Sequence, residues 1–277
     1  SPNEKDLYNE LSKYVKDQYN TALNKPKLDK TKRQNVTFAL VILQRRIASS
    51  TYALYKSLVR RKEKLEDLLK KGEEYLKNQN LQNADLDEAE DYSEKERWKL
   101  EEIWETTSVA ETKKELLEEI GTLNRLIQKA QSIINNEEEI KLKELKKSLG
   151  ELEQKFSEPK DKKIIIFTES LDTLKYLEGK IKQWGYSVNE IHGGMNLGEK
   201  VNAEKVFKTE TQILVATEAA GEGINLQFCH LMVNYDIPWN PNRLEQRMGR
   251  IHRYGQNKEV FIFNLVAEDT REGEVLN

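Results

Sequence analysis

The sequence predicts an α/β fold in which a long helical region precedes a parallel β-sheet with helices on both of its faces. Glycine gives the first indication, because only Gly72, Gly121 and Gly150 precede residue 160, whereas the other ten of the 13 glycines follow it. Charged residues give the second indication, because they make up 62 of the first 160 residues but only 31 of the last 117. Glycine weakens helix interiors and permits sharp turns, so the first part is predicted to be helical and the second turn-rich. We place the domain boundary after residue 158, which gives a helical region over 1–158 and an α/β domain over 159–277.

The helical region carries hydrophobic residues at alternating steps of three and four, the spacing of helices that pack along one another. One stripe comprises Leu40, Leu43, Ile47, Leu54, Leu58, Leu65 and Leu68. A second comprises Ile120, Leu123, Ile127, Ala130 and Ile134, and resumes after Asn136 with Leu142, Leu145, Leu149, Leu152 and Phe156. Residues 77–95 are polar and acidic, which predicts a loop or a short helix. We expect a helical hairpin or coiled-coil-like bundle that protrudes from the second domain.

The second domain alternates short apolar runs with amphipathic segments. The predicted strands are 164–168, 187–191, 212–216, 231–235 and 260–265, and the predicted helices between them include 171–181 and 199–207. This alternation is typical of a parallel sheet covered by helices on both faces. Ligands of such sheets bind at the carboxyl ends of the strands. The turns of interest are therefore 168–170, 192–196, 217–225 and 236–241.

Composition excludes several classes of function. Lys and Arg total 45 against 48 Asp and Glu, so bulk charge does not attract nucleic acid or membrane, and anion binding requires a local cluster. The single cysteine, Cys229, excludes an internal disulfide framework. His192, His230 and His252 lack the spacing of metal ligands, so no metal site is expected in the chain. Without an apolar run of about 18 residues or an export signal, we expect a cytoplasmic protein with no membrane partner.

Residues 245–253 (EQRMGRIHR) are the densest candidate for chemistry. On a helix, Gln246, Arg250 and Arg253 lie at positions i, i+4 and i+7 and share one face. Guanidinium groups beside an amide suit the oxygens of a phosphate, and Gly249 would let a ligand approach that face closely. The alternative is a surface helix whose arginines pair with acidic residues.

A second candidate follows the predicted strand 212–216. Thr217 can offer a hydroxyl and an amide to a phosphate, and Gly221 and Gly223 permit tight turns with exposed amides. The segment fails as a dinucleotide fingerprint, because Leu226 holds the third glycine position. The His192-Gly193 turn could meet a nucleic-acid backbone or simply connect two elements. The chain has no glycine-rich loop ending in Gly-Lys-Ser/Thr, so its arginines are those of a phosphate site completed elsewhere.

Residues 162–277 resemble the second RecA-like lobe of the Swi/Snf-type DNA-dependent ATPases of helicase superfamily two. The run 235–241 (YDIPWNP) followed by 245–256 (EQRMGRIHRYGQ) is similar to the family's sixth motif and its lead-in. Residues 216–226 resemble the fifth motif, with Ala220 where many members have glycine. Residues 167–170 and 192–194 resemble the fourth motif and the short motif after it. The helical region resembles the family's insertion between its two lobes, as in prokaryotic members related to the RNA-polymerase-recycling ATPase.

The resemblance implies a RecA-like sheet sandwiched by helices, and it implies roles for particular residues. Arg250 and Arg253 would be arginine fingers toward ATP, with Gln246 positioning the γ-phosphate. Gly221 and Gly223 would line the nucleotide cleft. The residues implied to contact the DNA backbone are Thr168, Ser170, His192, Gly193 and Thr217. ATP would act with Mg, whose ligands are expected on a first RecA-like lobe outside these 277 residues.

These implications define the expected function. The chain would be the C-terminal half of an ATP-driven translocase on double-stranded DNA, inactive without the first RecA-like lobe, which is its expected partner. A protein partner on the helical protrusion is a further expectation. Two alternatives stay open: a strand-separating helicase of the same superfamily, and a protein-interaction scaffold without catalysis.

Overall fold

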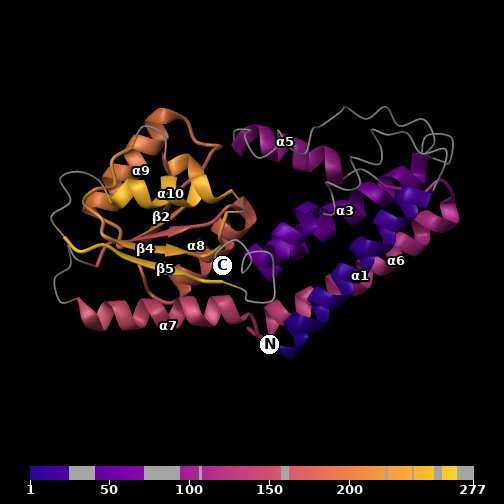
Figure 1. The fold of residues 1–277 in the computed structure, drawn as a ribbon, viewed down its shortest axis with the longest axis horizontal. Coiled ribbons are helices and arrows are strands. Elements are labelled where there is room, and N and C mark those ends of the chain that lie inside the picture. Colours follow the sequence, from indigo (N-terminus) through magenta and orange to yellow (C-terminus); the bar gives the residue numbers. More distant parts are fainter. Residues whose placement is uncertain are drawn as a thin grey trace. The chain divides into compact units, whose positions relative to one another are not determined.

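The computed structural model describes residues 1–24, 41–71, 94–105, 108–156, 162–221, 224–238, 240–252 and 258–266. The chain divides into two compact units, residues 1–139 and residues 140–277, which are described separately below (Figure 1). Among the described residues, no helix has both the length and the apolar character needed to cross a membrane.

The first unit is helical. Its helices are α1 (Pro2–Asn24), α3 (Thr51–Lys71), α5 (Glu94–Glu105) and α6 (Lys113–Asn135), and residues 41–49 are helical as well. A capping box starts α6, because the Thr112 side chain accepts from the Glu115 amide while the Glu115 side chain returns to the Thr112 amide. Helices α1 and α3 both pack along α6 (Figure 1).

The core of this unit joins the two hydrophobic stripes read from the sequence. Leu54, Leu58 and Leu65 of α3 are buried together with Leu116 and Leu123 of α6. Leu40, at the start of the first stripe, lies outside the described residues. The predicted helical region is therefore present, and its apolar faces meet as their spacing indicated.

A buried polar network crosses this core. The Arg61 guanidinium lies 2.8 Å from a Glu119 carboxylate oxygen, and both side chains are 2% exposed. The Tyr14 hydroxyl donates to the same oxygen at 2.8 Å, and Ser108 donates its hydroxyl to the other Glu119 oxygen at 2.5 Å. Burial raises the pKa of Tyr14, so its hydroxyl keeps its proton. These bonds lock α1, α3 and α6 in one register.

The second unit contains a five-stranded parallel sheet in the order β2-β3-β1-β4-β5. Its strands are β1 (Ile164–Phe167), β2 (Val188–Ile191), β3 (Ile213–Ala216), β4 (Leu231–Asn234) and β5 (Phe261–Asn264). Its helices are α7 (Ile140–Lys155), α8 (Leu171–Gln183), α9 (Leu197–Thr209), the 3₁₀ turn η2 (Glu218–Gly221) and α10 (Pro241–Ile251). The predicted α/β fold, with a helical region before a parallel sheet, is confirmed.

Each face of the sheet has its own core, because neighbouring strand residues point to opposite sides. Ile164 and Ile166 of β1 are buried in one cluster with α7 and α8. Ile165 and Phe167 are buried in the other, with α9 and Ile251 of α10. A left-handed Gly185, with φ of 91°, ends the turn after α8, where a side chain would be strained. The central strands β1, β3 and β4 are buried on both faces.

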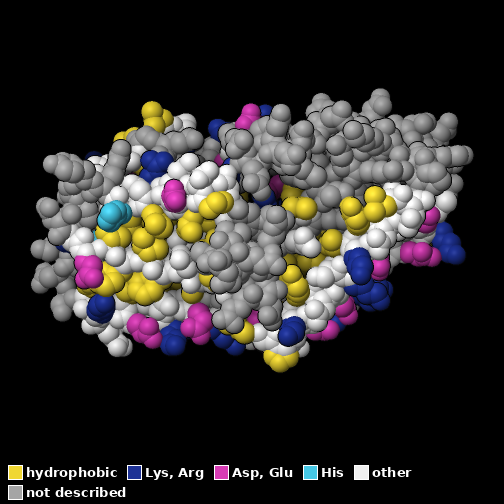
Figure 2. Space-filling model, in the orientation of Figure 1, with side chains coloured by type: hydrophobic (Ala, Val, Ile, Leu, Met, Phe, Trp, Pro, Cys, Tyr) yellow, Lys and Arg dark blue, Asp and Glu magenta, His cyan; other side chains and the backbone are white. Residues whose placement is uncertain are grey.

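The division between the units falls at 139/140, whereas the sequence placed a boundary after residue 158. The difference comes from α7, whose Leu142, Leu145, Leu149 and Leu152 pack on the sheet and belong to its core. The sequence assigned these leucines to the helical region because a leucine stripe does not reveal what covers it. Lys side chains are interspersed with Glu along the outer side of α7 (Figure 2), so its exposed face carries no single sign of charge.

Candidate functional site

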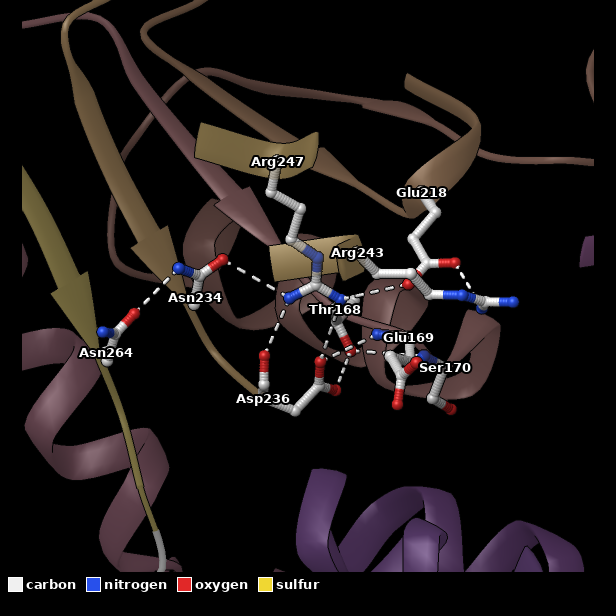
Figure 3. Close-up of polar contacts among 9 residues, drawn as sticks. All are labelled: Thr168, Glu169, Ser170, Glu218, Asn234, Asp236, Arg243, Arg247 and Asn264. Carbon is white, nitrogen blue, oxygen red and sulfur yellow. Dashed lines mark hydrogen bonds and ion pairs between the residues drawn. The ribbon is translucent and has the colours of Figure 1, made fainter. Parts of the chain in front are cut away.

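The carboxyl ends of β1, β3 and β4 meet at one edge of the sheet, because the strands are parallel and in register. Phe167 at the end of β1 is paired with Ala216 of β3 on one side and with Asn234 of β4 on the other. The turns that follow these strands therefore lie next to one another. Figure 3 shows the polar side chains that gather there.

Asp236, in the turn after β4, ties that turn to the one after β1. Its carboxylate is buried and accepts the Thr168 hydroxyl at 2.6 Å and the Glu169 amide at 2.9 Å. The Ser170 amide donates to the Thr168 oxygen at 3.3 Å, and the Ser170 hydroxyl caps the start of α8. The two turns consequently form one hydrogen-bonded unit.

Arg247 ties α10 to the same unit. Asn240 caps this helix and Pro241 occupies its first turn, which starts the helix directly after the β4 turn. The Arg247 guanidinium is 2% exposed and donates to the Asp236 carbonyl at 2.8 Å and to the Asn234 side chain at 3.3 Å. It also lies over the Phe167 ring, 5.5 Å from the centroid. A buried cation is thus held against the ends of β1 and β4.

Glu218, in the turn after β3, completes the arrangement. One of its carboxylate oxygens lies 2.7 Å from an Arg243 nitrogen, and the other lies 3.8 Å from the Arg247 Nη2 atom. Arg243 and Arg247 are four residues apart, so they project from the same face of α10. Three strand ends and one helix are therefore joined by charged side chains (Figure 3).

The predicted nucleotide-facing residues of α10 that the structure describes are less buried than Arg247. Gln246 is exposed and Arg250 is partly exposed, and within the described part of the chain Arg250 has no hydrogen bond or ion pair. A Cβ at Gly249 would meet no described atom within 4 Å, so the surface beside Arg250 is open. Gly221 ends η2.

Two of the predicted site residues, Arg253 and Gly223, lie outside the described residues. Sequence reasoning passed over Arg247, Glu218 and Asp236. The available signals were the four-residue spacing from Arg243 and the position of both acids directly after strands.

The residues predicted to contact DNA fall into two groups. Thr168, Ser170 and Thr217 are buried at the strand ends just described. His192 and Gly193 follow β2, where His192 lines a hollow of about 530 Å³ together with Glu178, Glu190 and Glu199.

The His192 imidazole lies 3.7 Å from Glu190, and this ring together with the Lys175 ammonium lowers the pKa of Glu190 to about 2. Glu190 is therefore flanked by the His192 ring and the Lys175 ammonium at the edge of this hollow.

Solved structures share this architecture. The "C-terminal part of Fun30 ATPase domain" matches with a TM-score of 0.54 at 19% identity, covering 99% of this chain and 84% of that one. The helicase domain of Hef from Pyrococcus furiosus matches with a TM-score of 0.58 at 18% identity, covering 98% of this chain and 55% of that one. At these identities the likeness concerns the fold.

Sequence comparison defines the class of the second unit. Residues 140–255 match the helicase conserved C-terminal domain, so the second unit is similar to the C-terminal lobe of helicases. The match begins at the first residue of α7, where the second compact unit also begins.

More particularly, this lobe is related to that of RapA. The chain is 35% identical over 113 residues to the RNA polymerase-associated protein RapA of Vibrio parahaemolyticus, which covers 39% of this chain and 12% of RapA. It is 42% identical over 155 residues to the "Uncharacterized ATP-dependent helicase YqhH" of Bacillus subtilis, covering 56% of this chain and 26% of YqhH. The chain thus spans about a quarter or less of these relatives.

Proposed function

We propose that the chain supplies the C-terminal half of an ATP-driven translocase on double-stranded DNA. The observation that carries the proposal is the position of Arg250, a guanidinium without a partner in the described residues, on a helix anchored at the ligand edge of the sheet by Arg247. The relation to RapA and to an ATP-dependent helicase supports the same assignment.

The residues present fit part of a triphosphate site. A guanidinium without a partner among the described residues, beside the open surface at Gly249, suits phosphate oxygens. The sequence, however, holds no glycine-rich loop with a lysine to cradle them. Arg250 and Arg253 would stabilise negative charge as ATP supplies its γ-phosphoryl group, and Gln246 would orient it. Gly221 and Gly223 would line the cleft. Mg and the phosphate cradle would belong to a first RecA-like lobe.

DNA would contact the turns after β1, β2 and β3. The residues assigned to this role are Thr168, Ser170, His192, Gly193 and Thr217. Contacts of this kind with phosphates position a duplex without reading its sequence. The Thr168 and Ser170 hydroxyls and the Glu169 and Ser170 amides are already bonded within the protein, so a phosphate would have to compete with these bonds.

The test is Arg250→Ala in the protein that includes the first lobe. Loss of an arginine finger should lower DNA-stimulated ATP turnover by about 100-fold or more, with the Kd for duplex DNA changed less than about threefold. Arg125→Ala, at an exposed arginine of α6, is the matched control. Near-normal turnover of Arg250→Ala would contradict the proposal, as would motor-like turnover by the 277-residue chain alone.

The strand-separating alternative is favoured by one observation, the similarity to YqhH, which is named a helicase. A translocase displaces a triplex-forming strand from duplex DNA, whereas a helicase releases one strand of the duplex itself. Both assays on the same protein separate the two functions. A scaffold would do neither.

A further inference from the structure

The buried Arg247 guanidinium has two nitrogen atoms, Nε and Nη2, without a hydrogen bond in the described structure. The Nη2 atom lies 3.6 Å from Asp236 and 3.8 Å from Glu218, beyond the usual hydrogen-bond range. A buried donor without a partner is costly, so the arrangement favours any small movement that closes these gaps. A displacement of less than about 1 Å would do so.

These gaps separate elements that have different tasks in the proposed function. Asp236 is bonded to the Thr168 turn and Glu218 follows Thr217, and both turns are assigned to DNA. Arg247 lies on α10, three residues before Arg250. Movement of either turn changes the contact of a carboxylate with Arg247, and a helix moves as a rigid element.

We infer that Glu218 and Arg247 are positioning residues that couple DNA contact at the strand-end turns to the placement of Arg250. This inference rests on the proposed function. In this coupling, bound DNA shifts the turn after β3 toward α10. Glu218 then moves closer to Arg247 and keeps its ion pair with Arg243. Helix α10 is thereby held in the position where Arg250 meets the nucleotide. Neither residue touches the substrate.

The test is Glu218→Gln in the protein that includes the first lobe. Glutamine retains the size of the side chain and removes the charge that attracts both arginines. The ratio of kcat with saturating duplex DNA to kcat without DNA should fall about tenfold, as expected for loss of one charge-assisted contact in the stimulated state. Glu218→Asp, which keeps the charge, should recover part of this ratio.

Two further variants secure the interpretation. Glu151→Gln removes an exposed carboxylate from α7, outside the candidate site, and should leave the ratio unchanged. Arg247→Lys keeps a positive charge but loses the planar fork, and it should lower the ratio as Glu218→Gln does. If the Arg247→Lys protein does not fold, the Glu218→Gln variant still tests the inference, because Glu218 is only partly buried.

The outcomes separate this inference from the proposed function. If duplex DNA stimulates wild-type turnover and Glu218→Gln keeps the full ratio, the coupling role is wrong and the proposed function stands. An equal fall of kcat with and without DNA, accompanied by a lower Tm, would show a merely structural role and overturn the inference. If wild-type protein has no DNA-stimulated turnover, the proposed function fails and the inference fails with it.

Discussion

The carboxylate of Asp236 accepts the hydroxyl of Thr168 at 2.6 Å, although 68 residues separate the two in the sequence. The same aspartate faces the buried Arg247. One side chain therefore joins the turn after β1, the turn after β4 and helix α10. The stability of this edge depends on keeping these groups paired.

Asp236→Asn should destabilise the second unit. The change leaves the Arg247 guanidinium buried without a full countercharge, which costs about 3 kcal/mol in free energy of unfolding. Native-state hydrogen exchange of the β1 and β4 amides measures the loss within the unit concerned. Glu245→Gln, at an exposed carboxylate, should leave that exchange unchanged. Equal exchange in both variants would mean that the buried pair contributes little.

Glu119→Gln should destabilise the first unit by a comparable amount, about 3 kcal/mol, because Arg61 would lose its buried partner. The triple variant Tyr14→Phe, Arg61→Met, Glu119→Leu removes every charge of the network and should recover much of the loss. Exchange of the α3 and α6 amides reports both effects. If the triple variant is the less stable of the two, the network stabilises the unit in its own right.

Acid should weaken the second unit through Glu190. Its pKa is about 2 in the folded chain against 4.5 ordinarily, mainly because of His192 and then Lys175. A lowered pKa adds stability that is present above pH 4.5 and is lost as the pH falls toward 2. Glu190→Gln should therefore show a flatter stability profile across that window, differing by at most about 3 kcal/mol. Glu151→Gln, an exposed site on α7, should keep the wild-type profile, and an identical profile for Glu190→Gln would refute the prediction.

Cys229 should be unreactive in the folded chain. Its side chain is fully buried, and burial raises the pKa of the thiol to about 12, so almost no thiolate forms at pH 8. The rate at which an aromatic disulfide reagent labels Cys229 should equal the rate at which the second unit opens, and labelling should become rapid in denaturant. Rapid labelling of the native protein would contradict the buried position.

Periodicity in the sequence was sufficient for most of the second unit. The apolar runs and amphipathic segments coincide with β1–β5, α8 and α9, because hydrophobic spacing is a local property that each element displays by itself. The turns at 168–170, 217–225 and 236–241 followed from the strands, since parallel strands bring their carboxyl ends to one edge. Thr168 and the β3 turn were located in this way.

The identity of the arginine that anchors α10 did not follow from the sequence. Arg243, Arg247 and Arg250 share the chemistry of guanidinium, and only the rotation of the helix decides which is buried. Packing of Ile251 into the core and of Arg247 over Phe167 sets that rotation, and Arg250 is left partly exposed. The leucines of α7 pose the same problem, because their spacing predicts a buried face without naming the surface that buries it. Local patterns thus determined which elements form, and long-range contacts, absent from any local pattern, decided which side chains meet.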